Sequence, residues 1–176
     1  LLIRSDNVYG TAEEDAFRRD FTINGLFYEP RDGKVIDYVN GRADLERGVV
    51  RTIGQPEVRI QEDPVRIIRA IKFAARLGFG IAPETYDAMV HFRSQISKSS
   101  APRIAEEIVR LAQGGKARSS FRLLLDVGLF PLILPEVYRA LDQGVSSHFW
   151  NRLEQIDKLP NGVSEVTRVT LLAVLY

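Results

Sequence analysis

The chain has 176 residues, of which 45% are hydrophobic and 27% are charged, and its formal net charge is +1. This composition is typical of a globular protein of one or two domains and excludes a disordered chain. Cysteine is absent, which excludes disulfides and thiolate metal sites and fits a cytoplasmic protein. No apolar run approaches the ~20 residues of a membrane helix. The near-zero charge argues against a generally basic nucleic-acid coat.

The first 55 residues have the pattern of mixed α/β structure. Thr11 followed three residues later by Glu14 is a capping-box pattern, which predicts a helix over residues 11–19. Two β-prone runs, residues 26–28 and 35–39, flank a segment with proline and Asp-Gly turn chemistry. This arrangement predicts a β-hairpin.

A further strand is expected over residues 49–53, and no later strand is predicted. After Pro56, proline at helix starts and glycine or proline past helix ends predict an all-helical array. The expected helices cover residues 62–77, 83–96, 102–112, 117–127, 146–159 and the segment from 165 onward.

The first motif that could carry chemistry is Arg18-Arg19-Asp20, with Asn24 four residues further on. Arginine binds phosphate oxygens through paired hydrogen bonds, and aspartate accepts hydrogen bonds from hydroxyls such as those of a ribose. Asn24 would share a face with Asp20 if the segment were helical. On residue types alone, the favoured interpretation is an ordinary helix end, with the arginines at the negative pole of the helix dipole.

The second motif combines Asp63 with Arg66 and Arg69 at three-residue spacing, which places all three on one face of a helix. An alternative of equal weight is structural. Pro64 suits the first position of a helix, so Asp63 would be its N-cap and the two arginines a solvated face.

Hydrogen-bond chemistry gives the second motif a possible role in recognising a base. A carboxylate beside a guanidinium complements an edge that donates through an exocyclic amine and accepts through the adjacent ring nitrogen. Adenine and cytosine show that order, whereas guanine and uracil show the reverse. An Asp63/Arg66 pair would therefore admit ATP and CTP and reject GTP and UTP, without distinguishing ATP from CTP.

The remaining polar segments have ordinary structural interpretations. Residues 37–45 form either a mobile element over a substrate or, preferably, a connection from a strand to a helix. The helix dipole alone accounts for the acidic residues Glu106 and Glu107.

Isolated aromatic and histidine side chains offer little further chemistry. Phe149 and Trp150 could stack on bases, but core packing is preferred. His91 and His148 stand alone, so the sequence contains no transition-metal site.

In their order and spacing, these motifs resemble the class II branch of the tRNA nucleotidyltransferases, which comprises CCA-adding enzymes and bacterial poly(A) polymerases. The resemblance extends from about residue 6 to 110. The matching blocks are Glu14-Asp15 with Arg18-Arg19-Asp20-Phe21-Thr22-Ile23-Asn24; Asp37-Tyr38 with Gly41 and Asp44-Leu45; Arg51 to Gly54 with Pro56; Glu62-Asp63-Pro64-Val65-Arg66 to Arg69; and Arg103-Ile104 with Glu106-Glu107.

The resemblance implies an α+β fold with three parts. Residues 1–55 would be the C-terminal part of a nucleotidyltransferase-fold palm, or head, with a β-hairpin and edge strands. Residues 56–116 would form an all-α neck that selects the base. Residues 117–176 would begin a helical body that binds RNA.

The resemblance also implies roles for both motifs. Four residues of the first motif would bind the sugar and triphosphate of the incoming nucleotide: Arg18, Arg19, Asp20 and Asn24. In the second motif, Asp63 and Arg66 would recognise the base, and Arg69 would lie near the phosphates.

The sequence departs from the family pattern at the metal site. The family holds two metal ions, expected to be Mg²⁺, on an Asp-x-Asp pair after a Gly-Ser turn, and no Asp-x-Asp pair occurs in these 176 residues. We expect the catalytic and metal-binding carboxylates to precede Leu1. These residues alone should therefore have no transferase activity, even with Mg²⁺.

Two segments, residues 6–10 and 51–59, resemble the bacterial poly(A) polymerase version of the family. The expected function is template-independent addition of AMP from ATP to RNA 3′ ends. One alternative is a CCA-adding or A-adding tRNA nucleotidyltransferase, which would use CTP and ATP or ATP alone. A second is a catalytically silent, helical protein that binds RNA or nucleotides.

Overall fold

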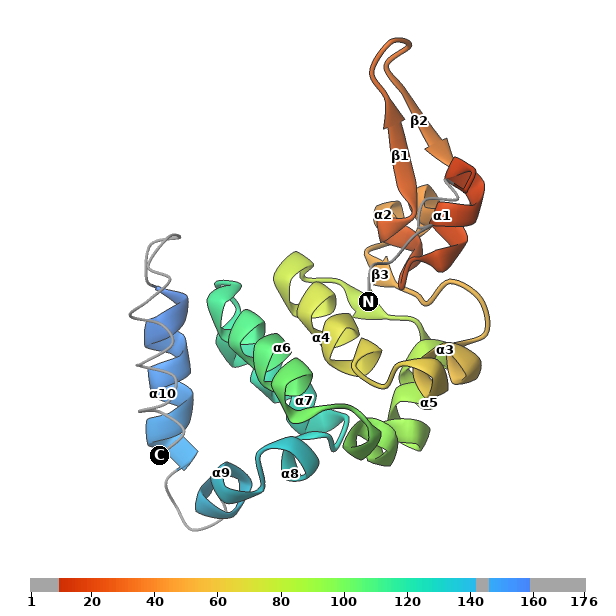
Figure 1. The fold of residues 1–176 in the computed structure, drawn as a ribbon. Helices are drawn as coiled ribbons and strands as arrows, with labels where there is room; N and C mark the ends of the chain where they lie inside the picture. The colour runs from red at the N-terminus through yellow and green to blue at the C-terminus, as the bar shows by residue number, and fades with distance from the viewer. Residues whose placement is uncertain (1–9, 142–145, 159–176) are drawn as a thin grey trace, which may run out of the picture.

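The computed structural model describes residues 10–141 and 146–158. A small α/β part leads into an array of helices, so the α+β class is confirmed (Figure 1). The elements, with η for 3₁₀ helices, are α1 (Ala12–Arg18), η1 (Thr22–Asn24), β1 (Leu26–Glu29), β2 (Lys34–Asp37), α2 (Gly41–Arg47), β3 (Val49–Val50), α3 (Pro56–Glu62), α4 (Arg66–Leu77), β4 (Gly80–Ile81), α5 (Pro83–Phe92), η2 (Arg93–Lys98), α6 (Ala101–Gln113), α7 (Ala117–Asp126), α8 (Phe130–Ile133), α9 (Pro135–Ala140) and α10 (Ser146–Asp157).

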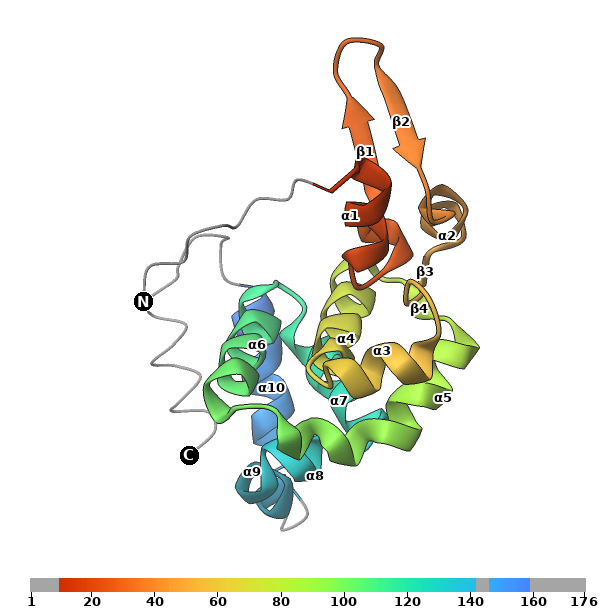
Figure 2. The same cartoon turned by 45° about the vertical axis from the view of Figure 1, so that its right-hand side comes forward.

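Local sequence signals correctly predicted the first helix and the hairpin. The Glu14 amide donates to Thr11 Oγ1 at 3.2 Å and the Thr11 amide to Glu14 Oε2 at 2.7 Å, which is the predicted capping box. Strands β1 and β2 pair antiparallel, from Leu26 opposite Asp37 to Glu29 opposite Lys34. The hairpin projects away from the helices (Figures 1 and 2).

The segment after the hairpin is a tightly packed connection into α2. The Asp37 carboxylate accepts three backbone hydrogen bonds, each of 3.0 Å, from the turn and the start of α2. A Cβ on Gly41 would lie 2.2 Å from the Thr22 carbonyl oxygen, so only glycine permits this approach of α2 to η1. Buried Asp44 accepts hydrogen bonds from Thr22 Oγ1 at 2.8 Å and from Arg51 Nε at 3.1 Å.

The helix expected over residues 62–77 begins later than predicted. Residues 56–62 form the separate helix α3, and Asp63 is its C-cap, with φ −144° and ψ 94°. Pro64 explains the break, because a proline disfavours the helical conformation of the residue before it. The main helix α4 therefore begins only at Arg66.

A short parallel strand was not predicted. After α4, Gly78 adopts a left-handed conformation with φ 70°, and β4 then pairs with β3. The Gly80 amide donates to the Gly48 carbonyl at 2.8 Å, and the Ala82 amide to the Val50 carbonyl at 3.0 Å. Each strand spans two residues, which is too few to show an alternating pattern in the sequence. The strand expected over residues 49–53 is therefore only Val49–Val50 in the structure.

One other helix prediction needs adjustment, and two short helices were missed. The helix expected over residues 83–96 ends as α5 at Phe92 and continues as η2. Helices α8 and α9 were not predicted, although a proline stands in the first turn of each. The expected helix from residue 165 onward lies outside the described residues. In the part of the chain that the structure describes, no helix is long and apolar enough to cross a membrane.

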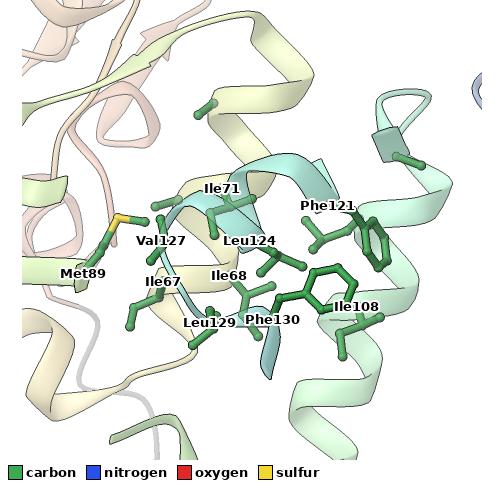
Figure 3. Packing of buried hydrophobic residues seen from close by; sticks show 14 of the residues in the cluster. Ile67, Ile68, Ile71, Met89, Ile108, Phe121, Leu124, Val127, Leu129 and Phe130 are labelled. Carbon is green, nitrogen blue, oxygen red and sulfur yellow. The ribbon is translucent and has the colours of Figure 1, made fainter. Parts of the chain in front are cut away.

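Among the described residues, one hydrophobic cluster joins the helices from α3 to α10, with α4 packed on α7 and α6 (Figure 3). Helix α4 buries Ile67, Ile68 and Ile71 completely. Phe149 and Trp150 on α10 are also buried, which confirms core packing as their role. Full burial of one such side chain stabilises the fold by about 1.5–3 kcal/mol.

The α/β part contacts this core through aromatic packing. Phe21 is fully buried, and its ring meets that of Phe73 on α4 edge to face, with centroids 5.7 Å apart. The backbone next to Phe21 is also hydrogen-bonded to the residue that follows β3, since the Thr22 amide donates to the Arg51 carbonyl at 2.9 Å. The Arg18-Arg19-Asp20 segment is thereby placed against α4.

Candidate functional site

A pocket of about 380 Å³ lies where the α/β part meets α4 and α6. Most of the side chains that line it are basic. The lining residues are Arg18, Arg19, Asp20, Asn24, Arg69, Lys72, Phe73 and Arg110. Five of the seven predicted site residues are thus brought together. The other two, Asp63 and Arg66, do not line this pocket.

The two adjacent arginines at the end of α1 differ in how they are held. Helix α1 ends at Arg18 because Arg19 adopts an extended backbone, with φ −69° and ψ 164°. Arg19 Nη2 donates to Asp15 Oδ2 at 2.8 Å, and its Nη1 donates to the Asn24 carbonyl at 3.0 Å. In contrast, the exposed Arg18 side chain makes no hydrogen bond or ion pair within residues 10–141 and 146–158.

Asp20 and Asn24 both face the pocket, although they do not share a helix. Asp20 lies in the bend between α1 and η1, so the helical relation considered for this pair is wrong. Asn24 Oδ1 is buried and has no hydrogen-bond partner among the described residues. A buried side-chain amide oxygen without a hydrogen bond costs folding free energy. This oxygen is therefore an acceptor that a ligand can use.

Asp20 joins the two sequence motifs. Its Oδ1 accepts a hydrogen bond from Arg66 Nε and its Oδ2 accepts one from Arg69 Nη1, each at 2.7 Å. The two arginines therefore share one face of α4, as their spacing predicted. Burial opposes ionisation of Asp20, but the hydrogen bonds from both arginines outweigh it, and the pKa of Asp20 lies below its usual 3.8.

Asp63 and Arg66 each bind other protein groups rather than each other. Asp63 Oδ2 accepts from Arg103 Nη2 at 2.8 Å. Arg66 Nη1 donates to the Arg59 carbonyl at 2.5 Å and to Glu62 Oε2 at 3.1 Å. Their backbones nevertheless meet, because the Arg66 amide donates to the Asp63 carbonyl at 3.0 Å.

Sequence reasoning missed the role of Glu107, which the helix dipole was taken to explain. This side chain is 5% exposed and accepts hydrogen bonds from Lys72 at 2.8 Å, Arg110 at 3.2 Å and Arg69 at 3.3 Å. Burial raises the pKa of Glu107, but the hydrogen bonds and charges of Lys72 and Arg69 lower it by a larger amount. The pKa of Glu107 therefore lies below its usual 4.5.

A sequence signal for Glu107 did exist. It stands beside Ile108 and four residues before Leu111, on the face of α6 that is buried in the core. A carboxylate on an apolar helix face requires partners, so its position indicated an ion-pair network. Lys72 and Arg110, which also line the pocket, are two of those partners.

Two protein families match separate parts of the chain. The family described as "Poly A polymerase head domain" matches residues 3–51. The family described as "Probable RNA and SrmB-binding site of polymerase A" matches residues 78–141. The pocket lies between these two segments and draws residues from both and from α4.

Individual relatives agree with these matches. The chain is 42% identical over 158 residues to poly(A) polymerase I of Escherichia coli strain CFT073, an alignment that covers 90% of the chain and 34% of the relative. It is 39% identical over 135 residues to the CCA-adding enzyme of Bacillus subtilis, covering 77% of the chain and 34% of that enzyme. The chain thus spans about a third of the length of these curated relatives.

A solved structure with the same fold is the CCA-adding enzyme of Bacillus stearothermophilus in complex with CTP. The TM-score is 0.66 and the sequence identity is 29%, over 93% of this chain and 47% of that one. The sequence motifs, the two family matches and the relatives all indicate the same family. The chain belongs to the class II nucleotidyltransferase family of bacterial poly(A) polymerases and CCA-adding enzymes.

Proposed function

We propose that the full-length protein adds AMP from ATP to RNA 3′ ends without a template, and that this chain supplies the part that binds the nucleotide. The observation that carries the proposal is the contact of Asp20 with both Arg66 and Arg69. Asp20 and Arg66 are 46 residues apart in sequence, yet this contact links the first motif to the second, of which Arg69 lines the same pocket. The 42% identity to poly(A) polymerase I supports ATP as the substrate.

Charge and hydrogen bonding suggest how the pocket would hold the sugar and triphosphate. Arg18 is the cationic side chain of the pocket lining that has no protein partner within the described residues, so its guanidinium can bind phosphate oxygens in pairs. Arg19 and Arg69 add positive charge at the same pocket. Asp20 and the unpartnered Asn24 Oδ1 supply acceptors for ribose hydroxyls.

Base recognition by Asp63 and Arg66 remains chemically feasible despite their other contacts. Arg66 uses Nε and Nη1 for protein partners, and Nη2 donates no hydrogen bond within the described residues. Asp63 Oδ1 accepts only the Val65 amide, at 3.3 Å. One donor and one acceptor are thus left, which is the pattern that complements adenine or cytosine.

Divalent metal ions serve catalysis in this family, and we propose Mg²⁺ for this protein. The described residues do not fit that ion, because none of their histidine, aspartate and glutamate side chains form a group of three that could hold a metal. The residues of this chain bind and orient the nucleotide.

Addition of CCA to tRNA is the second candidate. It is favoured by the 39% identity to a CCA-adding enzyme and by the structural similarity to an enzyme in complex with CTP. The hydrogen-bonding pattern of Asp63 and Arg66 admits CTP as readily as ATP. The RNA 3′ end would bind along the helices in either case, a placement supported by the family match over residues 78–141.

The two candidates differ in their products. The full-length protein is incubated with Mg²⁺, all four nucleotides and an end-labelled RNA, which is either a generic RNA or a tRNA that lacks its CCA end. Long A tails on the generic RNA support the proposed function. Addition that stops at CCA on the tRNA supports the second candidate. Failure to extend either RNA would show both to be wrong.

Base choice tests the role of the second motif. Replacing Arg66 by alanine should reduce the preference for ATP over GTP, measured as the ratio of the two kcat/KM values, because it removes the guanidinium donor. Arg76→Ala is the matched control, since Arg76 is an exposed arginine on the same helix. An unchanged ratio in Arg66→Ala would contradict the proposed role in base recognition.

A further inference from the structure

Arg59 reaches from α3 back to the end of α1. Its Nη2 donates to two consecutive backbone carbonyls, that of Arg18 at 3.1 Å and that of Arg19 at 2.9 Å. The Arg59 side chain is 16% exposed, whereas Arg18 and Arg19, whose carbonyls it binds, are exposed residues. The contact spans about forty residues of sequence and links the two parts of the molecule that form the pocket.

The end of a helix is a natural site for such a cation. The last carbonyls of α1 have no partner within the helix, and they carry the negative end of its dipole. Because Arg19 leaves the helix in an extended conformation, both carbonyls are presented to Arg59 together. A guanidinium satisfies them with charge-assisted hydrogen bonds, which are stronger than hydrogen bonds between neutral groups.

Arg59 is itself fixed by the residues around it. Its Nη1 donates to Glu62 Oε2 at 2.8 Å, and the same oxygen accepts from Arg66 Nη1 at 3.1 Å. Arg66 in turn binds the Arg59 carbonyl at 2.5 Å and the Asp20 carboxylate at 2.7 Å.

Two arginines therefore hold three consecutive residues of the first motif. Arg59 binds the backbone of Arg18 and Arg19, and Arg66 binds the side chain of Asp20. The Arg18 side chain has no partner of its own among the described residues. Its direction into the pocket consequently depends on its backbone, and the Arg18 carbonyl is one of the two groups that Arg59 fixes.

We propose that Arg59 is a positioning residue for nucleotide binding: it fixes the backbone of Arg18 and Arg19 so that the Arg18 guanidinium meets the triphosphate. This inference rests on the proposed role of Arg18. It assigns Arg59 no contact with the nucleotide. The Arg19 side chain keeps its own partners, Asp15 and the Asn24 backbone carbonyl, so Arg59 should affect ATP affinity mainly through Arg18.

A double-mutant cycle tests this dependence. The dissociation constant for ATP is measured by isothermal titration calorimetry on the full-length protein and on three variants, Arg18→Ala, Arg59→Ala and the double variant. We expect each single change to weaken ATP binding by about tenfold or more. The double variant should bind ATP about as weakly as Arg18→Ala alone. In that variant the Arg18 side chain is already missing, so the loss of Arg59 can no longer misplace it.

The outcomes separate this inference from the proposed function. If Arg18→Ala weakens ATP binding but the two losses multiply in the double variant, Arg59 acts independently of Arg18 and the inference is wrong. The same conclusion follows if Arg59→Ala leaves ATP affinity unchanged. If Arg18→Ala itself leaves ATP affinity unchanged, the proposed role of Arg18 fails, and the inference fails with it.

Two further variants exclude a general loss of structure. Arg93→Ala removes another arginine that donates to a backbone carbonyl, that of Val90, at a site away from this pocket. It should leave ATP affinity unchanged. Arg59→Lys keeps the positive charge and part of the hydrogen bonding, so it should weaken ATP binding less than Arg59→Ala. This weakening should appear in the protein that has Arg18 and not in the Arg18→Ala variant. An Arg59→Lys effect of equal size without Arg18 would overturn the inference.

Discussion

Replacement of Asp20 by alanine should destabilise the protein, because it removes the carboxylate that joins the two motifs. Asp20 makes hydrogen bonds of 2.7 Å to Arg66 and to Arg69, and its side chain is only 20% exposed. The arginines are 12% and 33% exposed, so water cannot fully replace the lost carboxylate. The contact is therefore closer to a buried ion pair than to one on the surface.

The size of the effect follows from the partners that remain. A hydrogen bond to a charged group contributes roughly 1.5–3 kcal/mol, so two of them set an upper limit of about 6 kcal/mol. After the change, Arg66 keeps Glu62 and the Arg59 carbonyl, and Arg69 keeps Glu107. These partners reduce the loss, and we expect the free energy of unfolding to fall by about 2–4 kcal/mol.

Urea unfolding of the full-length protein measures this loss. Asp32→Ala is the matched control, because Asp32 lies 3.8 Å from Lys34 and both side chains are more than half exposed. That exposed pair should contribute less than about 1 kcal/mol. Equal stability of Asp20→Ala and Asp32→Ala would refute the view that Asp20 holds the α/β part against α4.

Two further predictions concern stability. The pKa values of Asp20 and Glu107 in the folded protein lie below the 3.8 and 4.5 of the unfolded chain, so the unfolded chain binds more protons in acid. Their stabilisation should be complete above about pH 5 and should decline as the pH falls below the unfolded values towards the lower pKa values of the folded protein. Melting temperatures measured across about pH 3–7 should therefore fall less in acid for Asp20→Asn than for the unchanged protein, and an equal fall would contradict this. Gly41→Ala should cost about 1–3 kcal/mol, because its Cβ would meet the Thr22 carbonyl. Gly80→Ala, with its nearest neighbour at 3.9 Å, is the control, and equal melting temperatures would refute the steric argument.

Features that depend on neighbouring residues were predictable from the sequence. The capping box of α1, the hairpin turn and the buried stripe of α4 each follow from residues within one or two turns. The family resemblance, in contrast, implied that Arg18, Asp20 and Arg69 belong to one site. The structure brings these three residues to one pocket.

Features that depend on distant partners were not predictable in this way. The pairing of β4 with β3 needs contact between segments about thirty residues apart, and each strand has only two residues. The partners of an ion pair are also set by the fold. The sequence suggested Asp63 beside Arg66, whereas the folded chain pairs Asp63 with Arg103 and Arg66 with Asp20.

The affinity of the full-length protein for ATP, with Arg18 replaced by alanine, tests the proposed nucleotide pocket most directly. Arg31→Ala serves as the control, because Arg31 is an exposed arginine in the hairpin turn and the change in net charge is the same. We predict that Arg18→Ala weakens ATP binding by about tenfold or more, whereas Arg31→Ala leaves it unchanged. Equal ATP affinities for the two variants would contradict the assignment of this pocket to the triphosphate.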